Sequence, residues 1–488
     1  MHMNKSLIIF ALSFSAISFS GLTMGATLTT YPAGQGVATL DDYTIRVKEQ
    51  PGDKWQDVAV YPVKVDQTDG RGHNVRTASM AYFDFDTPVE VEIIPNYTHV
   101  ETAKVRPLSY GIPFTTAGDT LRLTLTEPAN LSVEINGDIF RNLHLFANPV
   151  DANRPTPKEI KKRKDLIYFA PGYHKLPDDK LFVPSNTTVY IDGGARVEGM
   201  LIADGVENVK FYGRGEVHPE GRGEGVYIKR SKNVEADGII VTQIPVGKSD
   251  SVKISNVKSI SSYGWGDGMN VFASNNVSYD RVFCRNSDDC HTVYATRKGF
   301  QGGCKNITME NSTLWADVAH PFMIGLHGAA TEIGPEATPD TIQNLRYKNI
   351  DILDHNETQI DYQGCFAINC GDNNIVKDVV FDDIRVEDFR KGQLFNIRIF
   401  HNDKYCKAPG LLVKDILFKD ITYNGDKSEL SIICGFDADR KVENLTFENL
   451  MINGEKIYDD MPGKPKWFKT GDMGRIYVGN HVEGVTFR

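Results

Sequence analysis

The strongest constraint on the fold is a short pattern that recurs along the second half of the chain. Each copy holds an aliphatic residue, then any residue, then an aromatic or large apolar residue. The copies begin at Val209, Val277, Ile307, Leu345, Val379, Ile416, Leu445 and Val485. From Val277 onward the steps are 30, 38, 34, 37, 29 and 40 residues. Unequal steps of this size predict coils with a common core and loops of variable length.

The residue in front of the pattern supports the same interpretation. Asn frequently precedes the aliphatic residue, as at Asn276, Asn306, Asn344 and Asn444. Asn tolerates the left-handed backbone of a tight bend, so we expect each coil to turn there. We interpret residues 166–488 as a parallel β-helix in which each coil buries its apolar face on the next. A β-propeller also repeats at about 40 residues, but the irregular steps and the single strand per copy argue against it.

The region before the coils has a different pattern of apolar and polar residues. Between residues 27 and 150 short runs alternate apolar and polar side chains, as in Tyr43–Val47 and Leu121–Leu125. Alternation with period two at short spacing predicts an antiparallel β-sandwich. We expect it to have an accessory, carbohydrate-contacting or packing role. Residues 151–165 are Pro-rich and then basic, which predicts a surface linker.

The first 26 residues carry one Lys, then an apolar run, then small residues up to Gly25-Ala26. This is the form of a secretory signal peptide. An uncleaved anchor is the alternative, because Met24 stands where a smaller residue is usual. No later segment approaches the roughly 18 apolar residues that span a bilayer. We therefore expect a secreted or periplasmic protein with no membrane span after signal removal.

Composition narrows the function classes. The 488 residues carry a formal net charge of −10, which argues against nucleic acid as a partner and mildly against a polyanionic substrate. All seven Cys lie between Cys284 and Cys434 and form no CxxC pair, so neither a disulfide scaffold nor a zinc site is expected. Pairing after export, as between Cys365 and Cys370, stays open. No calcium-loop motif occurs, and we expect no metal and no cofactor.

Three carboxylates are the candidate catalytic groups. Asp267 lies between two glycines, and Asp288 and Asp289 follow it by 21 and 22 residues. One coil of a solenoid takes about 20 to 30 residues, so Asp267 is expected almost directly beneath the pair. Like charges this close raise at least one pKa, which leaves a protonated acid beside an ionised base. Asp-Gly and Ser-Asp-Asp are also common turn sequences, so this prediction depends on the solenoid.

With these motifs, residues 166–488 resemble the right-handed, pectin-lyase-like β-helix of the polygalacturonase clan. Asp267 matches the first catalytic Asp of its Asp-Gly motif, and Asp288-Asp289 match its Asp-Asp motif. Two motifs differ: Ala319-His320-Pro321 replaces Gly-His-Gly, and Arg398-Ile399-Phe400 replaces the uronate-binding Arg-Ile-Lys. The β-sandwich and the Leu314-Trp315 segment are more similar to glycoside hydrolase family 49, the dextranase and isopullulanase family.

The resemblance implies an all-β protein and inverting hydrolysis of an α-linked polysaccharide, a dextran-like glucan first. Asp288 would be the acid, and Asp267 and Asp289 would share the base role on a water molecule. His320 is expected to orient this set or to pack. We expect stacking on sugar rings, with core packing as the alternative, from Trp265, Tyr294, Trp315 and Tyr362. Arg297 and His327 are expected to bind hydroxyl groups.

Three other functions stay open. A polygalacturonase-type pectin hydrolase would share the same acids. A polysaccharide lyase commonly needs an Arg or Lys base near a uronate, often with calcium, and the three Asp residues argue against it. A non-catalytic carbohydrate-binding β-helix would need no acid–base pair.

Overall fold

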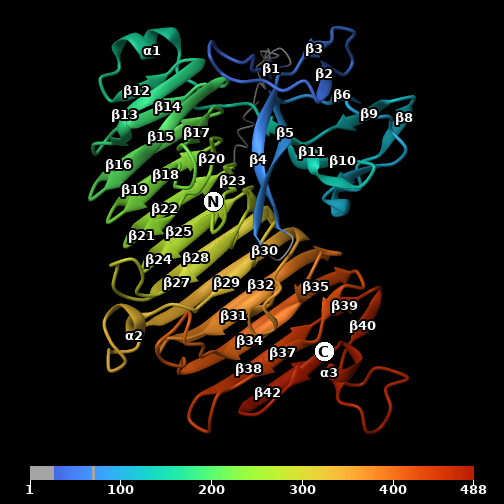
Figure 1. Cartoon of the computed structure of the whole chain (residues 1–488), viewed down its shortest axis with the longest axis vertical. Helices are drawn as coiled ribbons and strands as arrows, with labels where there is room; N and C mark the ends of the chain where they lie inside the picture. Colours follow the sequence, from blue (N-terminus) through green and yellow to red (C-terminus); the bar gives the residue numbers. More distant parts are fainter. Residues whose placement is uncertain (1–26, 69–71) are drawn as a thin grey trace, which may run out of the picture.

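The computed structural model describes residues 27–68 and 72–488, so the expected signal peptide lies outside the described residues. The chain forms two all-β bodies that lie side by side, a β-sandwich and a long parallel β-helix (Figure 1). The predicted all-β, pectin-lyase-like fold is confirmed. The described helices are single short turns: α1 (Pro157–Lys162), α2 (Ala329–Glu332), α3 (Thr470–Met473), η1 (Leu108–Tyr110) and η2 (Ile360–Tyr362). None of them is long and apolar enough to cross a membrane.

The sandwich packs one sheet on another around a core of alternating apolar residues. The first sheet holds β1 (Leu28–Thr30), β4 (Val60–Thr68), β5 (His73–Phe85), β7 (Ala103–Arg106), β10 (Ala129–Ile135) and β11 (Asp138–Pro149). The second holds β2 (Tyr43–Glu49), β3 (Gln56–Asp57), β6 (Val89–Pro95), β8 (Phe114–Ala117) and β9 (Thr120–Leu125). The expectation that every pair is antiparallel is wrong at β5 and β11, which run parallel. Since these two strands are far apart in sequence, short-range alternation cannot set their direction.

The β-helix is built mainly from short strands that pair in parallel with the coil before and the coil after. Near its end β39 and β40 pair antiparallel, and β33 and β36 form a separate parallel pair. Its first strands are β12 (Leu166–Phe169), β13 (Gly172–Phe182), β14 (Thr188–Ile191), β15 (Ala195–Asp204), β16 (Glu207–Gly213), β17 (Glu216–His218), β18 (Val226–Lys229), β19 (Lys232–Asp237), β20 (Ile240–Val241), β21 (Val246–Gly247), β22 (Asp250–Ser255) and β23 (Lys258–Ile260). The middle strands are β24 (Met269–Phe272), β25 (Asn275–Asp280), β26 (Phe283–Asn286), β27 (His291–Tyr294), β28 (Cys304–Ala316), β29 (Phe322–Ile324), β30 (Thr341–Asp354), β31 (Phe366–Cys370) and β32 (Ile375–Glu387). The last are β33 (Gly392–Gln393), β34 (Phe395–Ile399), β35 (Leu412–Asn424), β36 (Ser428–Glu429), β37 (Ser431–Cys434), β38 (Lys441–Glu448), β39 (Leu450–Ile452), β40 (Glu455–Ile457), β41 (Ile476–Val478) and β42 (Val482–Phe487).

The recurring pattern marks one strand of each coil. Its aliphatic residues pair with one another on successive coils, without a break from Val277 to Val485. Two further coils pair in the same register. In one of them Ala236 takes the place of the aromatic or large apolar residue, and in the other Val252 and Ile254 fit the pattern. The bend in front of the pattern is left-handed as predicted, with φ between 52° and 61° at Asn276, Asn306, Asn344 and Asn444. All seven Cys are free thiols, and most are buried in the coils.

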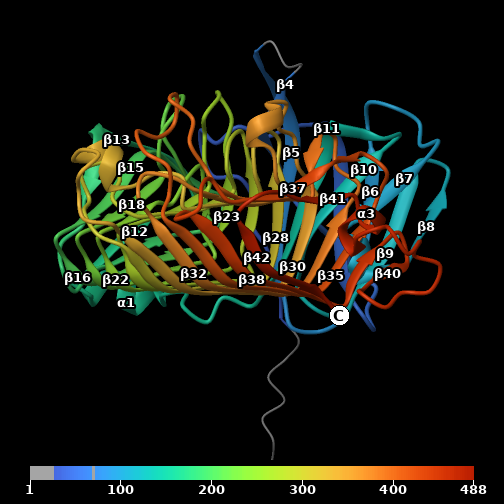
Figure 2. The same ribbon diagram turned by 90° about the horizontal axis from the view of Figure 1, so that it is seen from below.

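The two bodies share an apolar contact surface. Tyr61 and Val65 of the sandwich pack in one buried cluster with Ile260 and Phe283 of the coils. Within this contact region Arg214 donates to Asp84 at 2.9 Å, and both side chains are almost fully buried. The β4–β5 hairpin runs along the flank of the coils, and Figure 2 shows its far end extending past them. Strand β4 of this hairpin lies beside β23 and β26, so the sandwich reaches the middle of the β-helix.

Candidate active site

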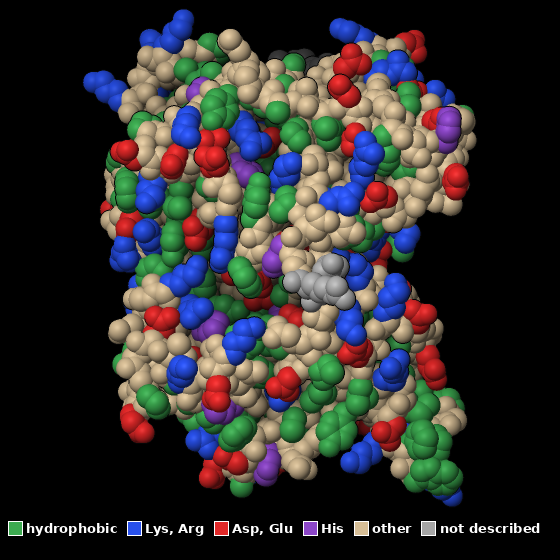
Figure 3. All heavy atoms as spheres, viewed as in Figure 1, with side chains coloured by type: hydrophobic (Ala, Val, Ile, Leu, Met, Phe, Trp, Pro, Cys, Tyr) green, Lys and Arg blue, Asp and Glu red, His purple; other side chains and the backbone are tan. Residues whose placement is uncertain are grey.

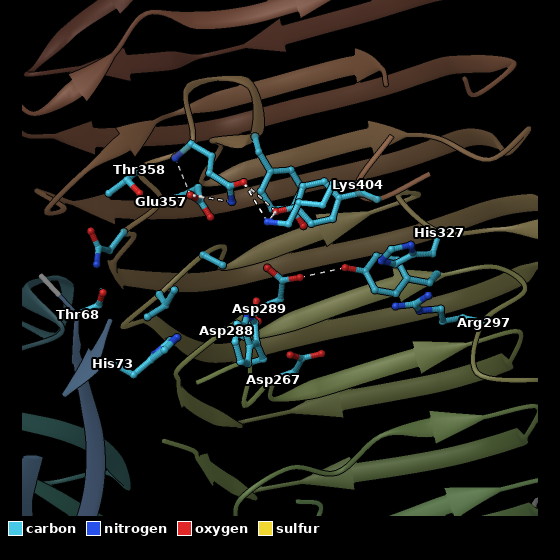
Figure 4. A pocket seen from close by; sticks show the side chains of 18 of the residues that line it. Thr68, His73, Asp267, Asp288, Asp289, Arg297, His327, Glu357, Thr358 and Lys404 are labelled. Atoms are coloured by element: carbon cyan, nitrogen blue, oxygen red, sulfur yellow. Dashed lines mark hydrogen bonds between the residues drawn. The ribbon is translucent and has the colours of Figure 1, made fainter. Parts of the chain in front are cut away.

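A large cleft lies where the hairpin meets the middle coils. It encloses about 770 Å³ and is lined by Asp267, Asp288 and Asp289 together with loop residues from later coils. Figure 3 shows a hollow on this face with acidic and basic side chains around it. In the close-up the three carboxylates occupy the centre, with His73 on one side and Arg297 and His327 on the other (Figure 4).

Asp267, Asp289 and His320 take equivalent places on three successive coils. The amide that follows Asp267 donates to the carbonyl of Asp289 at 2.9 Å. The amide that follows Asp289 donates to the carbonyl of His320 at 2.8 Å. The parallel ladder thus places Asp267 one coil below Asp289 and His320 one coil above it, and the 22-residue spacing corresponds to one turn.

The three carboxylates have different hydrogen-bond partners. Asp289 accepts from the Tyr294 hydroxyl at 3.0 Å, and its other oxygen lies 2.7 Å from Nδ1 of His320. Asp267 accepts from the Asn270 amide group at 2.6 Å. Asp288 accepts from the backbone amide of Asp289 at 3.0 Å, and no side chain of the described residues donates to it. Asp289 therefore has the most side-chain partners of the three carboxylates, and Asp288 has none among the described residues.

Burial and mutual repulsion keep a proton on this set. Burial first, and then the charges of Asp267 and Asp289, raise the pKa of Asp288 well above its usual range. Burial and the neighbouring Asp289 raise the pKa of Asp267 to about 7. Two acids whose pKa values are raised this far hold at least one proton between them at neutral pH, which is the condition for general acid catalysis.

His320 carries the opposite charge to the carboxylates. Burial is the largest single influence and lowers its pKa, but the charge and hydrogen bond of Asp289, together with Glu357 and the Tyr362 carbonyl, raise the pKa above its usual value. Its Nε2 lies 2.6 Å from the carbonyl oxygen of Tyr362, so both ring nitrogens face acceptors. A ring with two acceptors is satisfied only as the doubly protonated imidazolium. His320 is fully buried and does not line the cleft, so it contacts Asp289 and is not exposed to a substrate.

The four aromatic candidates differ in their exposure and in whether they line the cleft. Trp265 is 64% exposed at the edge of the cleft. Tyr294 and Tyr362 line the cleft but are largely buried, and the Tyr362 ring stacks on Tyr405 at 4.5 Å. Trp315 is fully buried beneath the Arg285 guanidinium, 4.0 Å from its ring centre, and does not line the cleft. Because β28 carries Trp315 under the sandwich, core packing is the role that its position supports.

Arg297 and His327 both line the cleft, on the side away from the hairpin. Arg297 lies 3.5 Å from Glu332. His327 packs edge-on against Tyr294 at 4.9 Å, and burial together with Arg297 lowers its pKa to about 3. His327 is therefore neutral and suits hydrogen bonds to hydroxyl groups. Arg398, from the altered Arg-Ile-Phe string, bonds Asp361 at 2.6 Å and is not part of the lining.

Several lining residues gave no signal in the sequence. His73 comes from the sandwich hairpin, Arg222 from an early coil, and Glu357, Lys404 and Tyr405 from loops after the catalytic coils. These loops differ in length from coil to coil, so no fixed spacing connects them to the three Asp residues. Among the described residues no group of three or more His, Cys, Asp or Glu side chains could hold a metal ion.

No family model and no curated protein matches this sequence. Among solved structures, Dex49A from Penicillium minioluteum matches with a TM-score of 0.59 at 13% identity, covering 94% of this chain and 96% of that one. A Yersinia enterocolitica family 28 exopolygalacturonase matches with a TM-score of 0.49 at 11% identity, covering 81% and 96%. The match to Dex49A includes both the sandwich and the coils. The chain therefore has the fold of the right-handed β-helix glycoside hydrolases.

Proposed function

We propose that this protein is an inverting glycoside hydrolase that cleaves an α-linked polysaccharide. One observation carries the proposal: an offset of a single coil brings Asp267 beneath the Asp288-Asp289 pair, and all three carboxylates line one large cleft. An acid that keeps its proton and a carboxylate that accepts one are the two groups that glycoside hydrolysis requires. The shared fold with Dex49A supports the same class of reaction.

The roles follow from the environments of the three carboxylates. Asp288 gives its proton to the glycosidic oxygen, and the bond from that oxygen to the anomeric carbon breaks. Asp267 and Asp289 hold a water molecule and accept its proton while the water oxygen bonds to the anomeric carbon from the opposite face. A base whose pKa is about 7, as at Asp267, is suited to this task near neutral pH. His320 and Tyr294 position Asp289 and leave the cleft free for the sugar.

A neutral, dextran-like glucan is the first substrate to test. In the altered Arg-Ile-Phe string Arg398 is tied to Asp361, and Phe400 is fully buried where a uronate-binding Lys would stand. That string therefore offers no cation to a uronate in the cleft.

A second candidate substrate, an anionic polysaccharide such as polygalacturonate, is favoured by other residues of the lining. Arg222, Lys404 and Lys407 line the cleft, and none of the three forms an ion pair within the described part of the chain. In a protein with a formal net charge of −10, such cations would attract carboxylate or sulfate groups.

The deciding experiment is a hydrolysis screen of the mature chain on dextran, pullulan and polygalacturonate, with Asp288→Asn as the control. We expect reducing ends to be released from dextran by the parent and not by the variant. Release from polygalacturonate alone, suppressed by salt, would establish the anionic candidate instead. Products that absorb in the ultraviolet would indicate a lyase, and binding without release would indicate a carbohydrate-binding protein.

We also propose that the enzyme acts outside the cytoplasm, as the apolar segment within residues 1–26 suggests. N-terminal sequencing of protein recovered from the periplasm or the culture medium tests this. A mature chain that begins near residue 27 supports export, whereas retention of Met1 in the cytoplasmic fraction contradicts it.

A further inference from the structure

We infer that the sandwich domain completes the active site: His73, at the end of the β4–β5 hairpin, braces Trp265 to form a stacking surface for a pyranose ring. This rests on the proposed function, because it assigns a sugar subsite in the same cleft. His73 and Trp265 both line the cleft, although almost two hundred positions separate them in the sequence. Figure 4 shows the His73 ring pointing from the hairpin into the cleft.

The hairpin holds His73 in place through a buried carboxylate. Nδ1 of His73 lies 2.5 Å from Oδ2 of Asp66, whose side chain has no solvent exposure. The same Asp66 oxygen accepts from the backbone amide of Gly264 at 3.4 Å, one residue before Trp265. Asp66 therefore ties the hairpin and the Trp265 loop to a single point.

The hairpin is also fixed to the catalytic coils. The backbone amide of Asp66 donates to Asp317 at 3.3 Å. Asp317 is fully buried and receives two hydrogen bonds from Arg285, at 2.9 and 3.1 Å. Since Asp317 lies three residues before His320, the turn that anchors the hairpin also leads into the residue that holds Asp289.

The loop that carries Trp265 is shaped to meet His73. Tyr263, Gly264 and Trp265 all have a left-handed backbone, with φ of 69°, 63° and 50°. Two of the three are bulky residues in a backbone conformation that persists only where the surroundings enforce it. A Cβ on Gly264 would lie 2.7 Å from Cδ2 of His73, so only glycine allows this close approach. The His73 and Trp265 ring centres then lie 5.6 Å apart.

The braced indole is suited to a sugar. Trp265 remains 64% exposed after its contacts with His73 and with the Arg222 guanidinium, whose carbon lies 5.7 Å from the ring centre. An exposed aromatic face offers the apolar surface on which a pyranose ring stacks. No hydrogen bond within the described residues reaches Nε2 of His73, which leaves it for a sugar hydroxyl. Trp265 and Asp267 line the same cleft, so a sugar stacked on the indole would share that cleft with the three carboxylates.

The test uses the full chain carrying Asp288→Asn, so that binding is measured without turnover. The probes are dextran and polygalacturonate, each cast in a native affinity gel. His73→Ala, His73→Gln, Trp265→Ala and the His73→Ala/Trp265→Ala double variant are compared. The matched control is His99→Ala, which removes a similar His–Asp pair, 2.8 Å long, elsewhere in the sandwich.

We expect His73→Ala and Trp265→Ala each to weaken binding by about tenfold, the effect of losing one or two good contacts. The double variant should lose less affinity than the product of the two single fold-losses, because both residues act through one stacking surface. His73→Gln should keep part of the affinity, and His99→Ala all of it. In the active chain, His73→Ala should raise KM and leave kcat within about twofold.

Two outcomes overturn the inference in distinguishable ways. If the parent binds and hydrolyses a polysaccharide but His73→Ala and Trp265→Ala match it, the proposed function stands and the subsite is wrong. If the parent binds and hydrolyses neither probe nor pullulan, the proposed function fails and the subsite with it. Thermal unfolding of each variant separates lost binding from lost fold, and Trp265→Phe replaces any variant that does not fold.

Discussion

Nδ1 of His320 lies 2.7 Å from Oδ1 of Asp289, and His320 is on the coil directly above that of Asp289. Nε2 of the same ring lies 2.6 Å from the carbonyl oxygen of Tyr362. The imidazolium donates in both directions, so the orientation of Asp289 is set by a buried ion pair. A carboxylate held this way cannot rotate freely, and it presents its remaining surface to the cleft. The contact explains how a histidine with no solvent exposure can affect the chemistry.

Replacing His320 should lower turnover while leaving substrate affinity nearly unchanged. His320→Gln keeps a donor and is expected to reduce kcat by about tenfold, and His320→Ala by about a hundredfold, because a misplaced carboxylate costs rate. Steady-state kinetics on the polysaccharide found in the screen measure this. Equal loss in KM and kcat for both variants would contradict a positioning role.

The same residue should make stability depend on pH. Because the folded pKa of His320 lies above its ordinary value of about 6.5, its stabilising contribution is complete below that pH and is lost as the pH rises through the folded pKa. The difference in melting temperature between the parent and His320→Gln should therefore be largest near pH 6 and shrink above it. Melting curves at half-unit steps of pH check the direction, and a difference that grows with pH would be inconsistent with the ion pair.

Asp288→Asn should abolish most activity and stabilise the fold. Turnover should fall by about 10² to 10⁴, the usual worth of a general acid. The raised pKa of Asp288 means that ionising this carboxyl destabilises the fold once the pH exceeds the unfolded pKa of about 4, so replacing it by an amide should stabilise the protein at neutral and higher pH. Urea unfolding at pH 8 and at pH 4 measures this. The increase in the free energy of unfolding of Asp288→Asn over the parent should appear only at pH 8.

The first product should have the anomeric configuration opposite to that of the substrate. Water held by Asp267 and Asp289 attacks the face away from the leaving group, so the configuration inverts. Proton NMR of a fresh hydrolysate, recorded before mutarotation, distinguishes the two anomers. An initial signal of the retained anomer would rule out the single-displacement mechanism.

Substitutions of the exposed Trp265 and the buried Trp315 should affect substrate binding and stability, respectively. Trp265→Ala should raise KM with little change in the free energy of unfolding, because the side chain is 64% exposed. Trp315→Ala should instead destabilise the protein by about 3–5 kcal/mol, the range for a large buried aromatic side chain. Urea unfolding and kinetics on both variants check the contrast. A raised KM in a folded Trp315 variant would place that residue in the substrate site after all.

The coils could be predicted because their signal repeats in register. Each copy combines a tight bend with a buried strand, so the pattern recurs in the sequence. The coil at Val234 gave no signal, because the small Ala236 stands in the place of the aromatic or large apolar residue, whereas Val252 and Ile254 of the next coil fit the pattern. The parallel pairing of β5 with β11 was missed because the two strands are distant in sequence.

By itself the sequence determined the β-helix, the sandwich and the three carboxylates one coil apart, because these depend on period and spacing along a regular ladder. Tertiary structure alone decided that Trp315 lies under the sandwich, that Arg398 faces Asp361, and that His73 reaches Trp265. Those positions depend on loops of unequal length and on how the two bodies pack. Contacts of this kind depend on packing in three dimensions, and periodic patterns in the sequence do not predict them.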